Sequence, residues 1–189
     1  MANIASVTYA IEGSKESLQK INEAISAAVD SKDNRYELYK AAEYLGLPIV
    51  KNITRLGGEI DEKPELLDGV LRFHSEERWG LQDFAGLLEQ HFPDIKVYWI
   101  VEEPGLEVFC TNDKEGKYFP ERYLVDACFD SIDYYEYFET EEQIYKWLAK
   151  ITHGEIKTES DVEKYNDNAS NSNLDRYIYI HKFEITEDY

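Results

Sequence analysis

The chain has 189 residues, of which 43% are apolar and 14% aromatic, and it carries a net charge of −19. This apolar and aromatic content can supply a buried core and is untypical of disordered chains. The excess negative charge repels phosphate groups, so it disfavours direct nucleic-acid binding and attraction to anionic membranes. We therefore expect a folded protein whose partner is another protein with a basic surface.

The N-terminal sequence and the cysteines predict a cytoplasmic location. Residues 1–5 contain neither the basic region nor the long apolar region of a signal peptide. No run approaches the roughly 18 apolar residues of a membrane span. Cys110 and Cys128 lie in strand-like sequence and form no C-x-x-C pair. We expect two reduced thiols in a core, with a disulfide between neighbouring strands as the alternative.

The first sixty residues predict a strand followed by two helices. Residues 5–11 alternate and are rich in strand formers, and Ser14 is a suitable N-cap for the helix that follows. That helix repeats apolar residues every three to four positions: Leu18, Ile21, Ile25 and Val29. A second helix over 36–45 ends at Gly46, and residues 49–60 are expected to be extended, with a turn or bulge at Gly57 and Gly58.

Residues 68–105 predict strand, helix and strand. The strands cover about 68–75 and 95–101, and the helix covers 81–91. We expect one buried helix face, made by Trp79, Leu81, Phe84, Leu87 and Leu88. Opposite it we expect either the pair Val97 and Trp99 or the pair Tyr98 and Ile100. The acidic strand ends are expected to be an exposed rim: Glu76, Glu77, Glu102 and Glu103.

The C-terminal half predicts a meander, helices and a last strand. Residues 106–110 pair with the preceding strand, and another strand is expected over 118–129. Acids and aromatic residues alternate over 126–142, and Thr140 begins a capping box for the next helix. Residues 160–173 are expected to be a short helix or a loop. Residues 174–185 predict a strand with one aromatic side: Tyr177, Tyr179, His181 and Phe183.

These elements predict the α+β class. The order over residues 3–102 is the β-α-β-β-α-β order of the ferredoxin-like sandwich, with two helices in the first helical position. We expect a single domain over 1–189 with a mostly antiparallel sheet and helices packed on one face. The ferredoxin-like core would cover about 3–112, and a C-terminal meander and helix would extend it over about 113–189.

Four short segments carry a family resemblance. They are the strand 71–73, the Trp79-Gly80 pair, the helix end 92–94 and the acidic turn 102–105. The chain resembles the YubB-like ferredoxin-like domains of plasmid, phage and gut-bacterial proteins, and the later segment 134–148 is also similar. Members often have proline after the tryptophan, where Gly80 stands here. The resemblance implies a bacterial mobile-element protein with that fold, and it implies no cofactor or catalytic residue.

No motif in the chain predicts chemistry. The four histidines lack the spacing of metal ligands: His74, His91, His153 and His181. Gly57 and Gly58 are not followed by the residues of a phosphate-binding loop, and no nucleophile motif is present. Adjacent acids at strand ends are typical of a solvated rim rather than of an acid–base pair. We therefore predict no catalytic residue, no metal and no cofactor.

The acidic, tyrosine-rich segment is the candidate interaction surface. Its residues are Asp126, Asp130, Asp133, Tyr134, Tyr135, Glu136, Tyr137 and Glu139. Tyrosine offers a large contact area at a low entropy cost, which favours a non-catalytic protein-interaction module. One alternative is that the tyrosines only cover a sheet edge. Another is an acidic DNA mimic that inhibits a nucleic-acid enzyme, because phosphates about 7 Å apart match every second extended residue. A third is an enzyme whose site residues are scattered along the chain.

Overall fold

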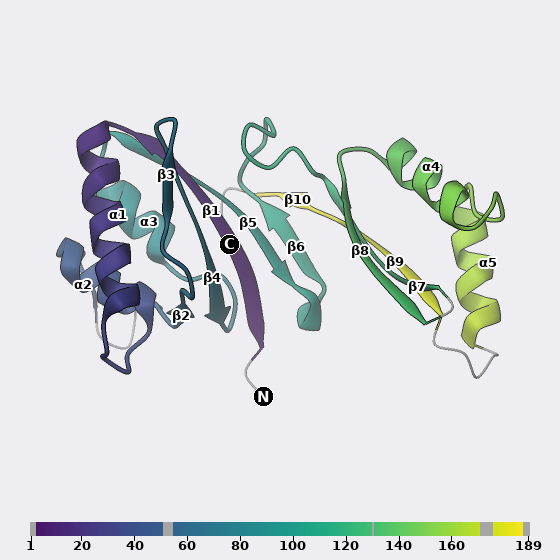
Figure 1. Cartoon of the computed structure of the whole chain (residues 1–189), viewed down its shortest axis with the longest axis horizontal. Helices are drawn as coiled ribbons and strands as arrows, with labels where there is room; N and C mark the ends of the chain where they lie inside the picture. The colour runs from purple at the N-terminus through teal and green to yellow at the C-terminus, as the bar shows by residue number, and fades with distance from the viewer. Residues whose placement is uncertain (1–2, 51–54, 130, 171–175, 187–189) are drawn as a thin grey trace. The chain divides into compact units, whose positions relative to one another are not determined.

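The computed structural model describes residues 3–50, 55–129, 131–170 and 176–186. The chain has the α+β class predicted from its sequence, and it divides into two compact units (Figure 1). Unit 1 comprises Met1–Lys114 together with Ile185–Tyr189, and unit 2 comprises Glu115–Glu184. The division at Lys114 lies close to the expected start of the C-terminal extension. The last residues of the chain return to unit 1.

Unit 1 contains a sheet with the strand order β10-β6-β5-β1-β4-β2, and β3 also pairs with β4. The central strand β1 is antiparallel to both β4 and β5. The bounds are β1 Ile4–Gly13, β2 Gly58–Glu59, β3 Glu65–Leu67, β4 Val70–Arg78, β5 Ile95–Glu103, β6 Val108–Thr111 and β10 Glu184–Ile185. Thr186 N–H donates to Thr111 O at 3.0 Å, which ties the end of the chain to β6.

Three α-helices accompany this sheet. They are α1 Lys15–Asp30, α2 Glu37–Leu45 and α3 Phe84–His91, and the short 3₁₀ turn η1 covers Pro104–Leu106. The predicted N-cap of α1 is confirmed, because Ser14 Oγ accepts a hydrogen bond from Ser17 N–H at 3.2 Å. Gly46 ends α2 in the left-handed conformation with φ 68°, as its position in the sequence predicted.

The core of unit 1 includes buried residues of the sheet and of all three helices. Alternate residues of β4 and β5 are buried, and Val97 and Trp99 are the pair that faces the core. Tyr9 and Phe73 stack with ring centroids 4.6 Å apart, and Phe84 of α3 meets Phe73 edge to face at 6.1 Å. Side chains of β1, β4 and α3 therefore meet at Phe73.

Three expectations for the segment 71–105 are wrong. Trp79 is 65% exposed and not in the core. Glu77 and Glu103 are buried, whereas both were expected on an exposed rim. At the end of β4 the cause is that the chain turns at Trp79 and Gly80, which have φ 69° and 91°, so α3 begins only at Phe84. At the end of β5, Glu103 accepts a hydrogen bond from the Asn3 amide. A bulky residue in the left-handed region costs about 1–2 kcal/mol, a cost that no sequence period reveals.

Unit 2 contains a three-stranded antiparallel sheet with the order β8-β7-β9. The strands are β7 Tyr123–Phe129, β8 Ile132–Phe138 and β9 Tyr177–Lys182, and the helices are α4 Glu141–Ile151 and α5 Glu159–Ser170. Its buried core takes residues from β7, α4, α5 and β9 and the segment before α5: Val125, Ala127, Ile144, Leu148, Ile156, Val162 and Ile178. The predicted capping box is confirmed, since Thr140 and Gln143 exchange hydrogen bonds with each other's main-chain N–H.

Several details of unit 2 differ from the expectations. The strand predicted over 118–129 begins only at Tyr123, and β8 was not predicted at all. The cysteines agree with the expectation, since both are buried and form no disulfide, Cys110 in unit 1 and Cys128 in unit 2. Among the described residues, no helix has the length and apolar character needed to cross a membrane.

Candidate interaction surface and a polar pocket

One side of the unit 2 sheet faces away from the core of that unit. The register gives three rows across β8, β7 and β9, because paired residues of antiparallel strands share a face. The rows are Tyr137–Leu124–His181, Tyr135–Asp126–Tyr179 and Asp133–Cys128–Tyr177. We call these nine residues the tyrosine face. Side chains that alternate with them along β7 belong to the buried core.

The tyrosine face presents aromatic rings to solvent. Tyr135, Tyr137 and Tyr179 are 43% to 55% exposed. Tyr135 and Tyr137 meet edge to face with ring centroids 5.9 Å apart, while Tyr177 and Tyr179 stack at 5.2 Å. These ring contacts run along β8 and β9, on either side of β7. The rings are therefore held in two ordered rows rather than exposed singly.

Asp126 lies at the centre of the tyrosine face. Its carboxylate accepts a hydrogen bond from the Tyr177 hydroxyl at 3.1 Å. Burial, followed by this hydrogen bond and the negative charge of Asp126, raises the pKa of Tyr177 to about 12. The nine residues include two carboxylates and no lysine or arginine. The face therefore combines anionic charge with aromatic rings.

The structure separates the predicted surface residues. Asp126, Asp133, Tyr135 and Tyr137 lie on the tyrosine face. The remaining described residues do not: Tyr134 packs edge to face on Phe129 and Trp147, Glu136 pairs with core residue Val125, and Glu139 N–H donates to Gln143 before α4. Asp130 lies outside the described residues. Only half of the predicted set therefore shares one surface.

Five residues of the tyrosine face were missing from that set: Leu124 and Cys128 of β7, and three residues of β9. Tyr177, Tyr179 and His181 come from β9, far from β8 in the sequence, and join it because both strands pair with β7. The alternation over 174–185 already predicted that these side chains share one side of a strand. The missing information was the pairing of that strand with β7.

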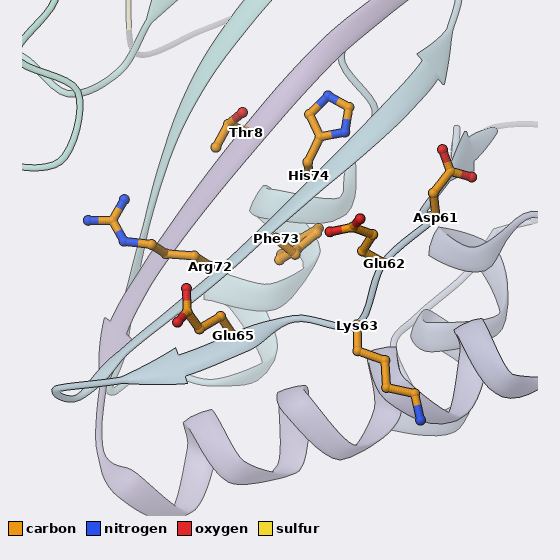
Figure 2. A pocket seen from close by; sticks show the side chains of 8 residues that line it. All are labelled: Thr8, Asp61, Glu62, Lys63, Glu65, Arg72, Phe73 and His74. Atoms are coloured by element: carbon orange, nitrogen blue, oxygen red, sulfur yellow. The ribbon is translucent and has the colours of Figure 1, made fainter.

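Unit 1 has a polar pocket of about 460 Å³ at the edge of its sheet. It opens where β4 changes partners, since β2 pairs with Glu76 and Glu77 whereas β3 pairs with residues 70–72. The lining residues come from β1, β3, β4 and the chain between β2 and β3: Thr8, Asp61, Glu62, Lys63, Glu65, Arg72, Phe73 and His74 (Figure 2). A volume of this size is in the range of small-molecule sites.

The pocket places carboxylates opposite a histidine. Figure 2 shows the Glu62 carboxylate pointing toward β4, while the Lys63 side chain points away, where it pairs with Asp30 at 2.6 Å. His74 Nε2 lies 3.0 Å from the Ser6 hydroxyl. This arrangement suits a polar group of a ligand. In the part of the chain that the structure describes, no group of three or more histidine, cysteine, aspartate or glutamate side chains is arranged so that it could hold a metal ion.

A buried carboxyl group organises the end of β4. Glu77 accepts hydrogen bonds from the hydroxyls of Tyr9 and Ser75, both at 2.7 Å, and from Gln82 N–H. Burial raises the pKa of the Glu77 carboxyl, although these three hydrogen bonds oppose the shift. Burial and the nearby Glu77 also raise the pKa of Tyr9. Glu77 does not line the pocket and holds core groups together instead.

Comparisons with family models, curated proteins and solved structures find no match to this chain.

Proposed function

We propose that the protein is a non-catalytic protein-interaction module and that its tyrosine face binds a basic partner protein. The middle row carries the proposal, because the exposed rings of Tyr135 and Tyr179 flank the Asp126 carboxylate. Aromatic faces attract cations, and a carboxylate among them adds charge pairing. Tyrosine is also a frequent hot-spot residue in protein interfaces. Lysine and arginine side chains of a partner therefore fit this row.

The arrangement of the acids favours a protein over the two alternatives. A DNA mimic needs its carboxylates in line, whereas Asp133 and Glu136 lie on opposite faces of β8. An ionisable group of shifted pKa that a substrate can reach would favour an enzyme. Glu77 has a raised pKa but is buried and does not line the pocket.

We also propose a fold family for unit 1. The order β2-β4-β1-β5, with helices after β1 and after β4, supports a ferredoxin-like sandwich of the kind the YubB-like resemblance implies. It also supports helices packed on one face, because buried residues of α1, α2 and α3 share a core with the same side of the sheet. We place the protein in the cytoplasm, in keeping with two buried cysteines that form no disulfide.

The test is affinity capture with matched variants. Wild-type protein is expected to retain a basic protein from lysate of its own cells, and the double variant Tyr135→Ala/Tyr179→Ala is expected to lose it. The control is Tyr44→Ala, which removes a 53% exposed tyrosine from α2 of unit 1 and should retain the partner. The captured protein is then purified, and its affinity is measured for the wild type, the double variant and Tyr44→Ala. We expect its affinity for the double variant to fall at least about tenfold.

Two outcomes contradict the proposal. Equal affinity for the double variant and the wild type removes the tyrosine face as the binding surface. Release of the partner by duplex DNA, together with loss of binding on moderate addition of salt, supports the DNA mimic instead. Circular dichroism of each variant checks that unit 2 remains folded.

A further inference from the structure

Trp79 is exposed in a backbone conformation that favours glycine. Its φ is 69° and its side chain is 65% exposed, between the end of β4 and the start of α3. Gly80, the next residue, has φ 91°. A glycine at position 79 would adopt this conformation without strain. A large apolar side chain that is both strained and exposed is a candidate for function, because nothing in its own packing explains it.

The structure holds this turn firmly. All four main-chain carbonyls of residues 78–81 accept hydrogen bonds from two side chains. The Arg55 guanidinium donates to the carbonyls of Trp79 and Leu81 at 3.3 and 3.5 Å. The Gln82 side-chain amide donates to the carbonyls of Arg78 and Gly80 at 2.8 and 2.7 Å. The strained conformation is thus over-determined by its surroundings, which is the condition under which such strain persists.

The turn is also anchored to the core and to the start of β1. Glu77, buried beneath it, accepts the Gln82 N–H, and Gln82 Oε1 accepts Gly57 N–H at 3.0 Å. Trp79 N–H donates to Asn3 O at 2.9 Å. The main chain that carries the indole is therefore held by groups on both sides of the turn. Such preorganisation lowers the entropy cost of binding through this side chain.

Two further exposed apolar residues come from segments that meet at Asn3. Ile4 is the first residue of β1 and follows Asn3, and Leu106 is the last residue of η1. The Asn3 amide donates to the buried Glu103 carboxylate, and the Asn3 side chain also lies directly against Gly105. Ile4, Trp79 and Leu106 therefore belong to three segments of unit 1 that meet at one anchored residue. We call them the Trp79 cluster.

The charges around this cluster are unbalanced. Arg78 pairs with Glu59 at 2.9 Å, whereas Arg55 donates to main-chain carbonyls and is the one cation of the two that keeps its charge uncompensated by an ion pair with a described residue. Glu76 and Glu107 are exposed, and neither forms an ion pair with a described residue. Their negative charge is therefore available to a partner, which must be basic to complement it.

We propose that the Trp79 cluster is a second interaction surface, which binds a basic segment of a partner protein through one apolar side chain of that segment. Trp79 supplies the apolar contact and a ring face for lysine or arginine, while Glu76 and Glu107 supply the opposite charge. The surface lies in unit 1, so it does not depend on the tyrosine face.

The experiment uses the full chain and an array of short synthetic peptides. Each peptide has one leucine or phenylalanine flanked by lysine and arginine. Matched peptides replace the cations with glutamate, or the apolar residue with serine. We expect the wild type to bind the first group and neither matched group. Trp79→Gly, which suits φ 69°, should weaken this binding at least about tenfold, while Tyr44→Ala and Tyr179→Ala leave it unchanged.

The melting temperature separates a binding role from a structural one. Trp79→Gly is expected to melt at or above the temperature of the wild type, because it relieves strain and removes no buried contact. A clear fall in melting temperature overturns the assignment. So does equal binding of the array by Trp79→Gly, a preference for the glutamate peptides, or no binding of any peptide. If Tyr179→Ala is the only variant that loses binding, the peptides bind the tyrosine face and not the Trp79 cluster, which also overturns the assignment.

Discussion

The two units use carboxyl groups in opposite ways. In unit 1, Glu77 lies inside the fold, where two hydroxyls and one main-chain N–H donate to it. In unit 2, Asp126 and Asp133 lie on a sheet face among exposed tyrosine rings. A buried carboxyl that satisfies several donors organises the chain around it, whereas an accessible one attracts cations. The net charge of the chain therefore does not show which acids a partner can meet.

The glycine-like turn and the tyrosine face show a related contrast. Trp79 is one residue, held by hydrogen bonds to every carbonyl around it. The tyrosine face is spread over three strands, and its geometry follows from strand pairing alone. We expect the first surface to be sensitive to single changes at the end of β4. The second should change gradually as its residues are replaced one at a time.

The largest effect is expected from Glu77→Ala. It removes the acceptor of Tyr9, Ser75 and Gln82, which leaves three buried donors unpaired and a cavity. The free energy of unfolding should fall by about 3 kcal/mol or more, as measured by urea denaturation. The matched control is Glu76→Ala, at the exposed neighbouring position, which should change it by less than about 0.5 kcal/mol. Equal effects of the two would contradict a buried organising role for Glu77.

A smaller effect is expected from Glu77→Gln, and it lies in the pH dependence of stability. The folded pKa of Glu77 is raised, so the stability it contributes is present below the unfolded value near 4.5 and is lost as the pH rises through the folded value. Glutamine does not titrate, although its NH2 group cannot accept the Gln82 N–H as the carboxylate does. Between pH 4.5 and pH 7 the free energy of unfolding of the wild type should therefore fall relative to that of Glu77→Gln. Urea denaturation at both pH values checks it, and a wild type that gains stability relative to the variant as the pH rises would show that the shift has the other sign.

The smallest effect is expected in unit 2 from Asp126→Asn. The asparagine keeps an acceptor for the Tyr177 hydroxyl but removes the negative charge. The pKa of Tyr177, about 12 in the wild type, should move down toward 10.0. Titration of the phenol by its ultraviolet absorbance measures this. The variant Tyr177→Phe lacks this phenol and so identifies its absorbance change among those of the other tyrosines. An unchanged pKa of Tyr177 in Asp126→Asn would mean that burial alone raises it.

Local patterns predicted most of the elements in both units. The N-cap at Ser14, the stop at Gly46 and the capping box at Thr140 were correct, since each depends on main-chain groups a few residues away. β8 was missed because alternating acids and tyrosines resemble a solvated loop when read alone. Four of the eight predicted surface residues lie on the tyrosine face. The three residues that β9 contributes to this face were not predicted, because their place there depends on the pairing of β9 with β7, a distant segment of the chain.

The sequence alone determined the α+β class, the negative charge that favours a basic partner, and the sides of the strands on which residues lie. Only the tertiary structure decided which strands meet, and therefore that Tyr179 lies beside Asp126 and that Glu77 is buried while Trp79 is exposed. The physical reason is the range of the interactions. Caps, turns and periodicity act over a few residues, whereas strand pairing and the hydrogen bonds that hold the Trp79 turn join segments far apart in the chain.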